Sequence, residues 1–275
     1  MPIRPSYTKL FKLIRYFLPN RYLARIEKPF FYSRERLNIL DRVILKVLQT
    51  LYEKSSDQND LIEHVWSSPT GKAWYNEFPV DFTTDKALHE ATSTSIQYIQ
   101  SVITDKPSGY FEFMEIGTAD GSMLNHISSN LLKIEKFIGL DLNPSAIEQN
   151  RRKYKQKSQL HFVCADAQEF LAQKHGRGII VFASRSFTCV TQEKLESILT
   201  LTAQNFTQAI IALQETCNTD FESYQSSIHR SNTMMYLHNY PALLSKYDFE
   251  ILHLEKFGMQ QSFVVMIAER KNAVA

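Results

Sequence analysis

The chain has 275 residues, of which 44% are hydrophobic and 22% charged, and its formal net charge is +2. This composition predicts a soluble globular protein with one large core and a smaller attached unit. No stretch approaches the 18 apolar residues of a membrane span, and Lys12 and Arg15 interrupt the N-terminal run that would otherwise resemble a signal peptide. The three cysteines form no CxxC pair and no disulfide framework, so we expect a reducing, cytoplasmic environment.

The small net charge hides an uneven distribution along the chain. Residues 1–46 hold eleven Lys and Arg against three acidic residues, a balance of +8. The other 20 basic and 26 acidic residues therefore leave a balance of −6. This asymmetry predicts that the N-terminal segment meets something anionic.

Two helices are predicted within this basic segment. The first has apolar residues at helical spacing between basic ones, namely Leu10, Leu13, Ile14, Phe17 and Leu18. The second has an apolar stripe of Leu40, Val43, Ile44, Val47, Leu48 and Leu51. Two interpretations of the first helix stay open: an anchor in anionic lipid at the inner face of a membrane, or a helix that docks on the rest of the chain. Nucleic acid is the least favoured partner, because no aromatic-interleaved basic motif is present.

A linker and a cap are predicted between this segment and the rest of the chain. Residues 53–60, EKSSDQND, are polar and are the best linker candidate. The aromatic residues that follow, Trp66, Trp74, Tyr75 and Phe82, form either a cap over a crevice or a satellite core. We therefore divide the chain into an N-terminal helical region, 1–82, and a main domain, 83–275. A helix over 86–104, with Thr83 or Thr84 as its N-cap, begins the main domain.

Beyond residue 110, short apolar runs alternate with helical patterns. The runs cover 111–116, 136–141, 159–164, 178–183 and 208–213. This alternation predicts a doubly wound α/β fold with a mostly parallel sheet, and the runs IIVFA and AIIAL should be its central strands. The segments FEILHLEKF and QSFVVMIAER lie too close together for a crossover helix, so they are predicted to pair as a C-terminal antiparallel hairpin.

The segment FEFMEIGTADG, residues 111–121, is the most informative part of the chain. An apolar run ends in an acid, and Gly117 and Gly121 would let the backbone turn closely around a ligand. Asp141 follows Gly121 by twenty residues and ends the next apolar run, and Asp166 ends the one after it. In a parallel sheet these ends meet at one edge, where such folds bind nucleotides.

Three motifs resemble those of class I S-adenosylmethionine-dependent methyltransferases: EIGTADG at 115–121, GLDLNP at 139–144 and CADA at 164–167. The resemblance covers about residues 111–270 and implies a seven-stranded sheet, methyl transfer and S-adenosyl-L-methionine as the cofactor. It implies that Gly117 and Gly121 flank the methionine part, Asp141 takes the ribose diol, Asp166 and Ala167 meet the adenine, and Glu115 steadies the loop or the ammonium group. The full implied cofactor set is Glu115, Gly117, Thr118, Ala119, Gly121, Asp141, Leu142, Asp166, Ala167 and Ser184.

Two positions depart from the family pattern. Ala119 stands where the middle glycine is usual, and it is tolerable only if its φ stays negative. An acid often found at the start of the fourth strand is absent, since Arg177 and Gly178 precede GIIVFA there.

Methyl transfer also needs alignment of an acceptor and, where the acceptor is protonated, a base. We predict His238 as the general base, with Tyr236 and Arg230 as further catalytic candidates on 227–247, the segment between strands five and six. The alternatives are a His238 hydrogen-bonded to backbone and an Arg230 that is a surface charge rather than a clamp on an anionic substrate.

The residues at the end of the fourth strand limit the types of methyl acceptor that we expect. Residues 183–186, Ala-Ser-Arg-Ser, lack the Asn/Asp-Pro-Pro-Tyr/Phe signature of many amino-group methyltransferases and offer no acid for a divalent metal. We therefore expect no metal and favour an oxygen of a small-molecule, glycan or lipid-linked acceptor. The alternatives are an inactive cofactor-binding protein and, less favoured, a nucleotide-dependent oxidoreductase.

Overall fold

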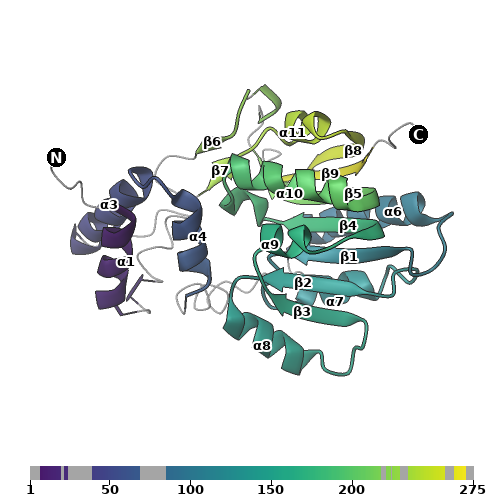
Figure 1. The fold of residues 1–275 in the computed structure, drawn as a ribbon, viewed down its shortest axis with the longest axis horizontal. Helices are drawn as coiled ribbons and strands as arrows, with labels where there is room; N and C mark the ends of the chain where they lie inside the picture. The colour runs from purple at the N-terminus through teal and green to yellow at the C-terminus, as the bar shows by residue number, and fades with distance from the viewer. Residues whose placement is uncertain are drawn as a thin grey trace.

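The computed structural model describes residues 7–19, 22–23, 39–68, 85–217, 221–223, 225–229, 235–257 and 263–270. Within them, a group of helices stands beside an α/β domain, and α4 lies between the outer helices and the sheet (Figure 1). Three of the sequence predictions fall outside the described residues. They concern the aromatic residues Trp74, Tyr75 and Phe82, the N-cap candidates Thr83 and Thr84, and the domain boundary at 82/83.

The main domain is built on a seven-stranded sheet in the order β3-β2-β1-β4-β5-β9-β8. The strands are β1 Phe111–Ile116, β2 Phe137–Asp141, β3 Leu160–Cys164, β4 Gly176–Ser184, β5 Phe206–Thr216, β8 Phe249–Phe257 and β9 Phe263–Arg270. The first five pair in parallel, while β9 is antiparallel to both β5 and β8. The predicted mostly parallel sheet and its C-terminal antiparallel hairpin are therefore confirmed.

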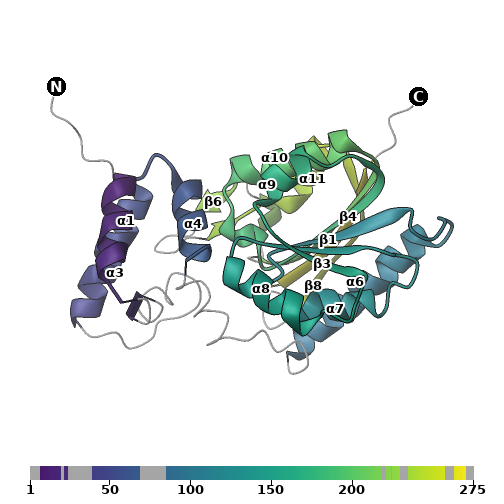
Figure 2. The ribbon, with the colours of Figure 1, turned by 60° about the horizontal axis from the view of Figure 1, so that its bottom comes forward.

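Helices cover both faces of the sheet (Figure 2). On one face lie α6 Lys86–Ile103, α7 Ser122–Ser128 and α8 Pro144–Lys153; on the other lie α9 Ala167–Ala172, α10 Gln192–Asn205 and α11 Tyr240–Lys246. Each face buries its own apolar cluster. Ile179 to Ala183 of β4 are at most 1% exposed, which confirms that this apolar run is a central strand covered on both sides.

Several helices begin at the carboxyl edge of the sheet with a side-chain cap. Asn143, Asp166, Thr191 and Asn239 accept hydrogen bonds from the first-turn amides of α8, α9, α10 and α11. Asp85, rather than Thr83 or Thr84, caps α6 by accepting from Leu88 N, so that prediction was wrong. Helix α9 was not expected, because its six residues are too few to show a helical period.

The N-terminal helices are α1 Tyr7–Phe17, α3 Ile39–Glu53 and α4 Gln58–Trp66. Both predicted helices are confirmed, but the predicted linker is not: α3 runs to its first residue and α4 begins inside it, with Asp57 as the cap. The three helices share a buried cluster that includes Phe11, Leu48, Tyr52 and Leu61 and that also takes in Met235 and Tyr236 of the main domain. None of the described helices is long and apolar enough to cross a membrane.

The remaining short elements lie between β4 and α11. They are the 3₁₀ turns η1 Phe187–Cys189 and η2 Phe221–Ser223 and the two-stranded ribbon of β6 Ile228–His229 and β7 Tyr236–Leu237. They stand between the sheet and the N-terminal helices, since β7 contacts η1 and Tyr236 lies in the N-terminal cluster.

Candidate active site

The turn after β1 depends on two glycines in the left-handed region. Gly117 has φ 76° and Gly121 has φ 72°. A Cβ on Gly117 would lie 2.8 Å from the Cβ of Ser186, and one on Gly121 would lie 2.8 Å from the ring of Tyr154. Both the backbone conformation and the surroundings therefore demand glycine at these positions.

Ala119, between these glycines, also has a positive φ of 47°. The expectation of a negative φ was therefore wrong. Two side chains hold the strained residue: Asp141 Oδ2 accepts from Ala119 N at 2.9 Å, and Asn150 Nδ2 donates to Ala119 O at 2.8 Å. A non-glycine residue is tolerated in the left-handed region here because the surrounding hydrogen bonds fix it.

Glu115 lies buried beneath the same turn. Its Oε2 accepts a hydrogen bond of 2.6 Å from Thr118 Oγ1, so the last acid of β1 steadies the loop directly. Burial, which outweighs the hydrogen bond from Thr118, raises the pKa of Glu115 to about 8, and the nearby Asp120 and Asp141 contribute to this rise. The carboxyl group is therefore mostly protonated at neutral pH.

The end of β2 joins this turn to the N-terminal helices. Asp141 is 4% exposed, and its Oδ1 accepts from Asn143 N at 2.9 Å. Asn143 in turn donates to the carbonyls of Trp66 and Ser68 at the end of α4, at 3.0 and 3.2 Å. The Asp141 carboxylate therefore lies between the first turn and the segment that binds the end of α4. Leu142 lies beside it, half-buried.

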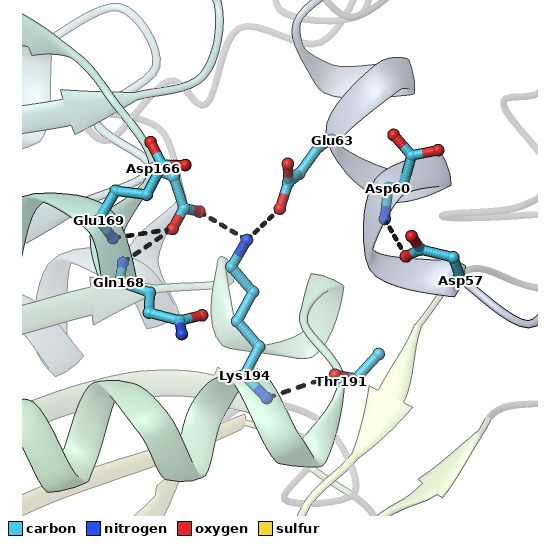
Figure 3. A network of polar contacts seen from close by, with 8 residues as sticks. All are labelled: Asp57, Asp60, Glu63, Asp166, Gln168, Glu169, Thr191 and Lys194. Atoms are coloured by element: carbon cyan, nitrogen blue, oxygen red, sulfur yellow. Dashed lines mark hydrogen bonds and ion pairs between the residues drawn. The ribbon is translucent and has the colours of Figure 1, made fainter.

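Asp166, at the end of β3, lies in an ion-pair network that sequence reasoning missed (Figure 3). Its Oδ1 accepts from the amides of Gln168 and Glu169, and its Oδ2 lies 2.6 Å from Lys194 Nζ of α10. Lys194 also contacts Glu63 of α4. Burial alone would lower the pKa of Lys194, but the two acids raise it above its ordinary value. Ala167, which follows Asp166, is buried in the first turn of α9.

A second strained turn follows β4. Ser184 ends the strand, and Arg185 has φ 57°. The Arg185 guanidinium pairs with Asp85 at 2.9 Å, which ties the N-terminus of α6 to this turn. Ser186 Oγ donates to Ile116 O at 2.7 Å, so the turns after β1 and β4 are in direct contact.

Glu215, near the end of β5, holds this second turn and was also missed. Its Oε1 accepts from Ser186 N at 3.0 Å and from Phe187 N at 2.8 Å. Its Oε2 is buried and has no hydrogen-bond partner among the described residues, and the same is true of the Tyr240 hydroxyl. Burial raises the pKa of Glu215 to about 8. The available signal was its place at the end of the apolar run AIIALQET, which matches the place of Asp141 in β2.

The methyltransferase domain family matches residues 113–206, which run from β1 to the start of β5. The matched range includes both turns but not Glu215. The chain contains a class I S-adenosylmethionine-dependent methyltransferase domain. The protein is accordingly a methyltransferase that uses S-adenosyl-L-methionine.

Solved structures agree in fold. The magnesium protoporphyrin IX methyltransferase of Synechocystis has a TM-score of 0.55 at 12% identity, covering 78% of this chain and 100% of its own. The N-methyltransferase NodS of Bradyrhizobium japonicum has a TM-score of 0.52 at 9% identity, with 68% and 98% covered. An S-adenosylmethionine-dependent methyltransferase of Clostridium acetobutylicum has a TM-score of 0.51 at 8% identity, with 71% and 98% covered. No curated protein matches the chain.

The turns fit the methyltransferase cofactor. Gly117 places no side chain between the two turns, where a Cβ would collide with Ser186. Asp141 presents a carboxylate beside the first turn. Gly117 and Gly121 would border the methionine part, and Asp141 would take the ribose hydroxyls. Asp166 already binds Lys194, so any contact of Asp166 with the adenine would share its carboxylate with that ion pair.

His238 does not have the surroundings of a general base in this methyltransferase. It is 1% exposed; its Nε2 donates to Phe187 O at 3.0 Å and its Nδ1 accepts from Ser227 Oγ at 2.5 Å. Burial lowers its pKa to about 4. Because both ring nitrogens are engaged and the neutral form is favoured, this arrangement matches the alternative interpretation, a backbone-bonded structural histidine.

The two other predicted catalytic residues are Tyr236 and Arg230, and the structure describes only Tyr236. The Tyr236 hydroxyl donates to Gln58 Oε1 at 2.6 Å and lies 3.0 Å from the Tyr52 hydroxyl, so it faces the N-terminal helices. Arg230 lies outside the described residues. Within the described residues, no three His, Cys, Asp or Glu gather as metal ligands would.

Two other histidines lie close to each other on the neighbouring helices α6 and α7. His89 lies in the first turn of α6, whose capping residue Asp85 binds Arg185. Its ring centroid is 6.3 Å from that of His126 on α7, the helix that follows Gly121. His89 is exposed and His126 half-buried, and burial followed by the charge of His89 lowers the pKa of His126.

Proposed function

We propose that this methyltransferase acts on an oxygen atom of a small-molecule, glycan or lipid-linked acceptor. The observation that supports this most is the turn after β4. It lacks the amino-group signature, and both Arg185 and Ser186 are engaged in contacts that hold neighbouring segments rather than an acceptor nitrogen.

The cofactor supplies a methyl group on a sulfonium, a reactive donor with a good leaving group. The protein therefore has two tasks: to hold acceptor and donor in line, and to take up the proton of the acceptor hydroxyl where there is one. The linked turns after β1 and β4 perform the first task, because Ser186 joins them directly and Glu215 and Asp141 fix them from the neighbouring strands.

For the second task we propose the His89–His126 pair in place of His238. The pair stands beside the α6 terminus that is fastened to the β4 turn, and His89 is accessible to an acceptor. The lowered pKa of His126 favours its neutral form at pH 7, and a neutral imidazole can accept a proton.

The solved neighbours carry different acceptor names. One is named for magnesium protoporphyrin IX, whereas another is named as an N-methyltransferase. Methylation at nitrogen is therefore the competing assignment, and the accepting atom decides between them.

The test uses S-adenosylmethionine labelled in the methyl group, with aqueous and organic extracts of cells as acceptor pools. Product from an oxygen acceptor is expected, and mild alkali releases volatile methanol if the product is an ester. A product that yields methylated amine on acid hydrolysis would overturn the proposal. Cofactor binding without transfer into any pool would favour the non-catalytic alternative.

Single His89→Asn and His126→Asn variants test the proposed base, with His161→Asn on β3 as the matched surface control. If the pair takes the proton, the rate of methyl transfer falls by roughly 10²-fold or more in at least one of the two variants. That rate also loses its dependence on pH, while the affinity for the cofactor is kept. Unchanged rates in both variants would remove the pair from the mechanism.

A further inference from the structure

The N-terminal helices expose an unusual amount of apolar surface. Of the twelve large hydrophobic residues that are exposed in the described part of the chain, eight lie on α1 and α3. They are Leu10, Leu13, Tyr16, Phe17, Ile39, Leu40, Val43 and Val47, and they are here called the outer patch. Tyr16 and Phe17 are 82% and 73% exposed. Concentration of this kind, unlike scattered apolar residues, marks an interaction surface.

The outer patch is not the face with which these helices pack on the protein. Leu10, Leu13 and Phe17 recur at helical spacing on α1, as do Leu40, Val43 and Val47 on α3. The buried faces are different ones, formed on α1 by Phe11 and on α3 by residues such as Leu45 and Leu48. The two helices contact each other and stand on the side of α4 away from the sheet (Figures 1 and 2). The apolar stripes therefore belong to neighbouring helices that face outward.

On the described helices α1 and α3, the exposed charges beside the outer patch are almost all positive. Lys9 on α1 and Arg42 and Lys46 on α3 are exposed beside the apolar stripes. Helix α1 has no acidic residue, Asp41 of α3 is 3% exposed, and Glu53 at the far end of α3 is the single exposed acid on the two helices. Apolar and aromatic side chains flanked by cations are suited to the boundary between anionic head groups and acyl chains.

We propose that the outer patch docks the methyltransferase on an anionic lipid bilayer surface, with Tyr16 and Phe17 entering the head-group region. The positive charge favours an anionic lipid surface over a second copy of the chain as the partner of the outer patch. Two copies of a segment with a charge of +8 would repel each other in a symmetric dimer. The inference is independent of the acceptor, although a docked enzyme would be well placed for a lipid-linked one.

The test is co-sedimentation of the full-length protein with vesicles of phosphatidylcholine alone and with 30% phosphatidylglycerol. We expect binding to the anionic vesicles that weakens as salt rises from 50 to 500 mM. The double variant Tyr16→Ser/Phe17→Ser should weaken binding by about tenfold or more, since it removes two aromatic groups from the interface. Arg42→Gln/Lys46→Gln should weaken binding about fivefold or more at 100 mM salt.

Leu132→Ser is the matched control, because Leu132 is 84% exposed on the main domain and lies outside the outer patch. It should bind as the wild type does, and all variants should keep the wild-type circular dichroism. Failure of the wild type to bind, or equal binding by the Tyr16/Phe17 variant, would overturn the proposal. So would a dimer in light scattering that dissociates in the Tyr16/Phe17 variant while vesicles capture neither protein.

Discussion

Two turns at the carboxyl edge of the sheet are built by the same device, and only one of them carries a recognisable motif. After β1, Ala119 has a positive φ and Asp141 of the adjacent strand β2 accepts its amide. After β4, Arg185 has a positive φ and Glu215 of the adjacent strand β5 accepts the two amides that follow. In each case a carboxylate from the neighbouring strand fixes a strained backbone.

The two carboxylates differ in what else they can do. Asp141 is 4% exposed, accepts from the amides of Ala119 and Asn143, and lies in the cofactor motif. Glu215 is fully buried, with a pKa raised to about 8, and one oxygen has no partner among the described residues. We propose that Asp141 both holds its turn and binds the cofactor, while Glu215 only holds its turn in position.

The largest expected effect comes from filling the space between the turns. Gly117→Ala places a Cβ 2.8 Å from Ser186 Cβ at a φ of 76°, so we expect a loss of about 2 kcal/mol or more in stability and at least tenfold in cofactor affinity. Unfolding in urea and calorimetry measure the two. Adding Ser186→Gly should restore part of the loss. A double variant no better than Gly117→Ala would mean that the contact between the turns is unimportant.

The next largest effect is expected in the pH dependence of stability. Because the pKa of Glu215 is raised, the folded state binds a proton that the unfolded state has lost between pH 4.5 and about 8. Stability should therefore be full below pH 4.5 and fall as the pH rises towards 8, by at most about 1.4 kcal/mol per pH unit for each such group. Glu115 contributes in the same direction.

Glu215→Gln removes the Glu215 share and keeps an acceptor for the two amides. Urea unfolding at pH 5.5, 6.5 and 7.5 should give a shallower decline for this variant than for the wild type. Parallel declines in the two proteins would show that Glu215 titrates normally.

A smaller effect is expected in the ion-pair network of Lys194, which joins α10 to α4 and to the end of β3. In double-mutant cycles, Lys194→Met with Asp166→Asn should give a coupling of about 1–3 kcal/mol, because both side chains are largely buried. Lys194→Met with Glu63→Gln should give under about 1 kcal/mol, because Glu63 is 40% exposed and solvent screens the pair. Equal couplings would contradict this ranking, and chemical denaturation at fixed ionic strength measures both.

The smallest effect tests the strain in the first turn. Ala119→Gly should stabilise the protein by up to about 1 kcal/mol, since glycine adopts a positive φ without the cost of a Cβ. Ala203→Gly within α10 should instead destabilise it by about 0.5–1 kcal/mol. Thermal unfolding of the two variants gives the signs, and a loss of stability in Ala119→Gly would show that the turn is not strained.

The sequence was sufficient to predict the sheet, because both the strands and the terminal hairpin leave a local pattern. The strands appear as short apolar runs between helical patterns, and the hairpin appears as two extended segments too close for a helix between them. The sequence was also sufficient to locate the first turn, because the glycines and the acid at the end of β2 follow one another at fixed intervals, but it did not predict the positive φ of Ala119. It was not sufficient for His238, because Phe187, which accepts from its Nε2, lies in the turn after β4, far from His238 in the chain. Nor could spacing reveal Glu215 or Lys194, because their roles arise only when β5 lies beside β4 and α4 beside α10.

Calorimetric titration tests the cofactor site most directly. S-adenosylmethionine and S-adenosylhomocysteine are titrated into the wild type, Asp141→Ala and the surface control Glu148→Ala, with folding checked by circular dichroism. We predict micromolar binding to the wild type and to Glu148→Ala, and loss of binding in a folded Asp141→Ala. Absence of binding to the wild type, or undiminished binding to Asp141→Ala, would contradict the assignment of this edge of the sheet as the cofactor site.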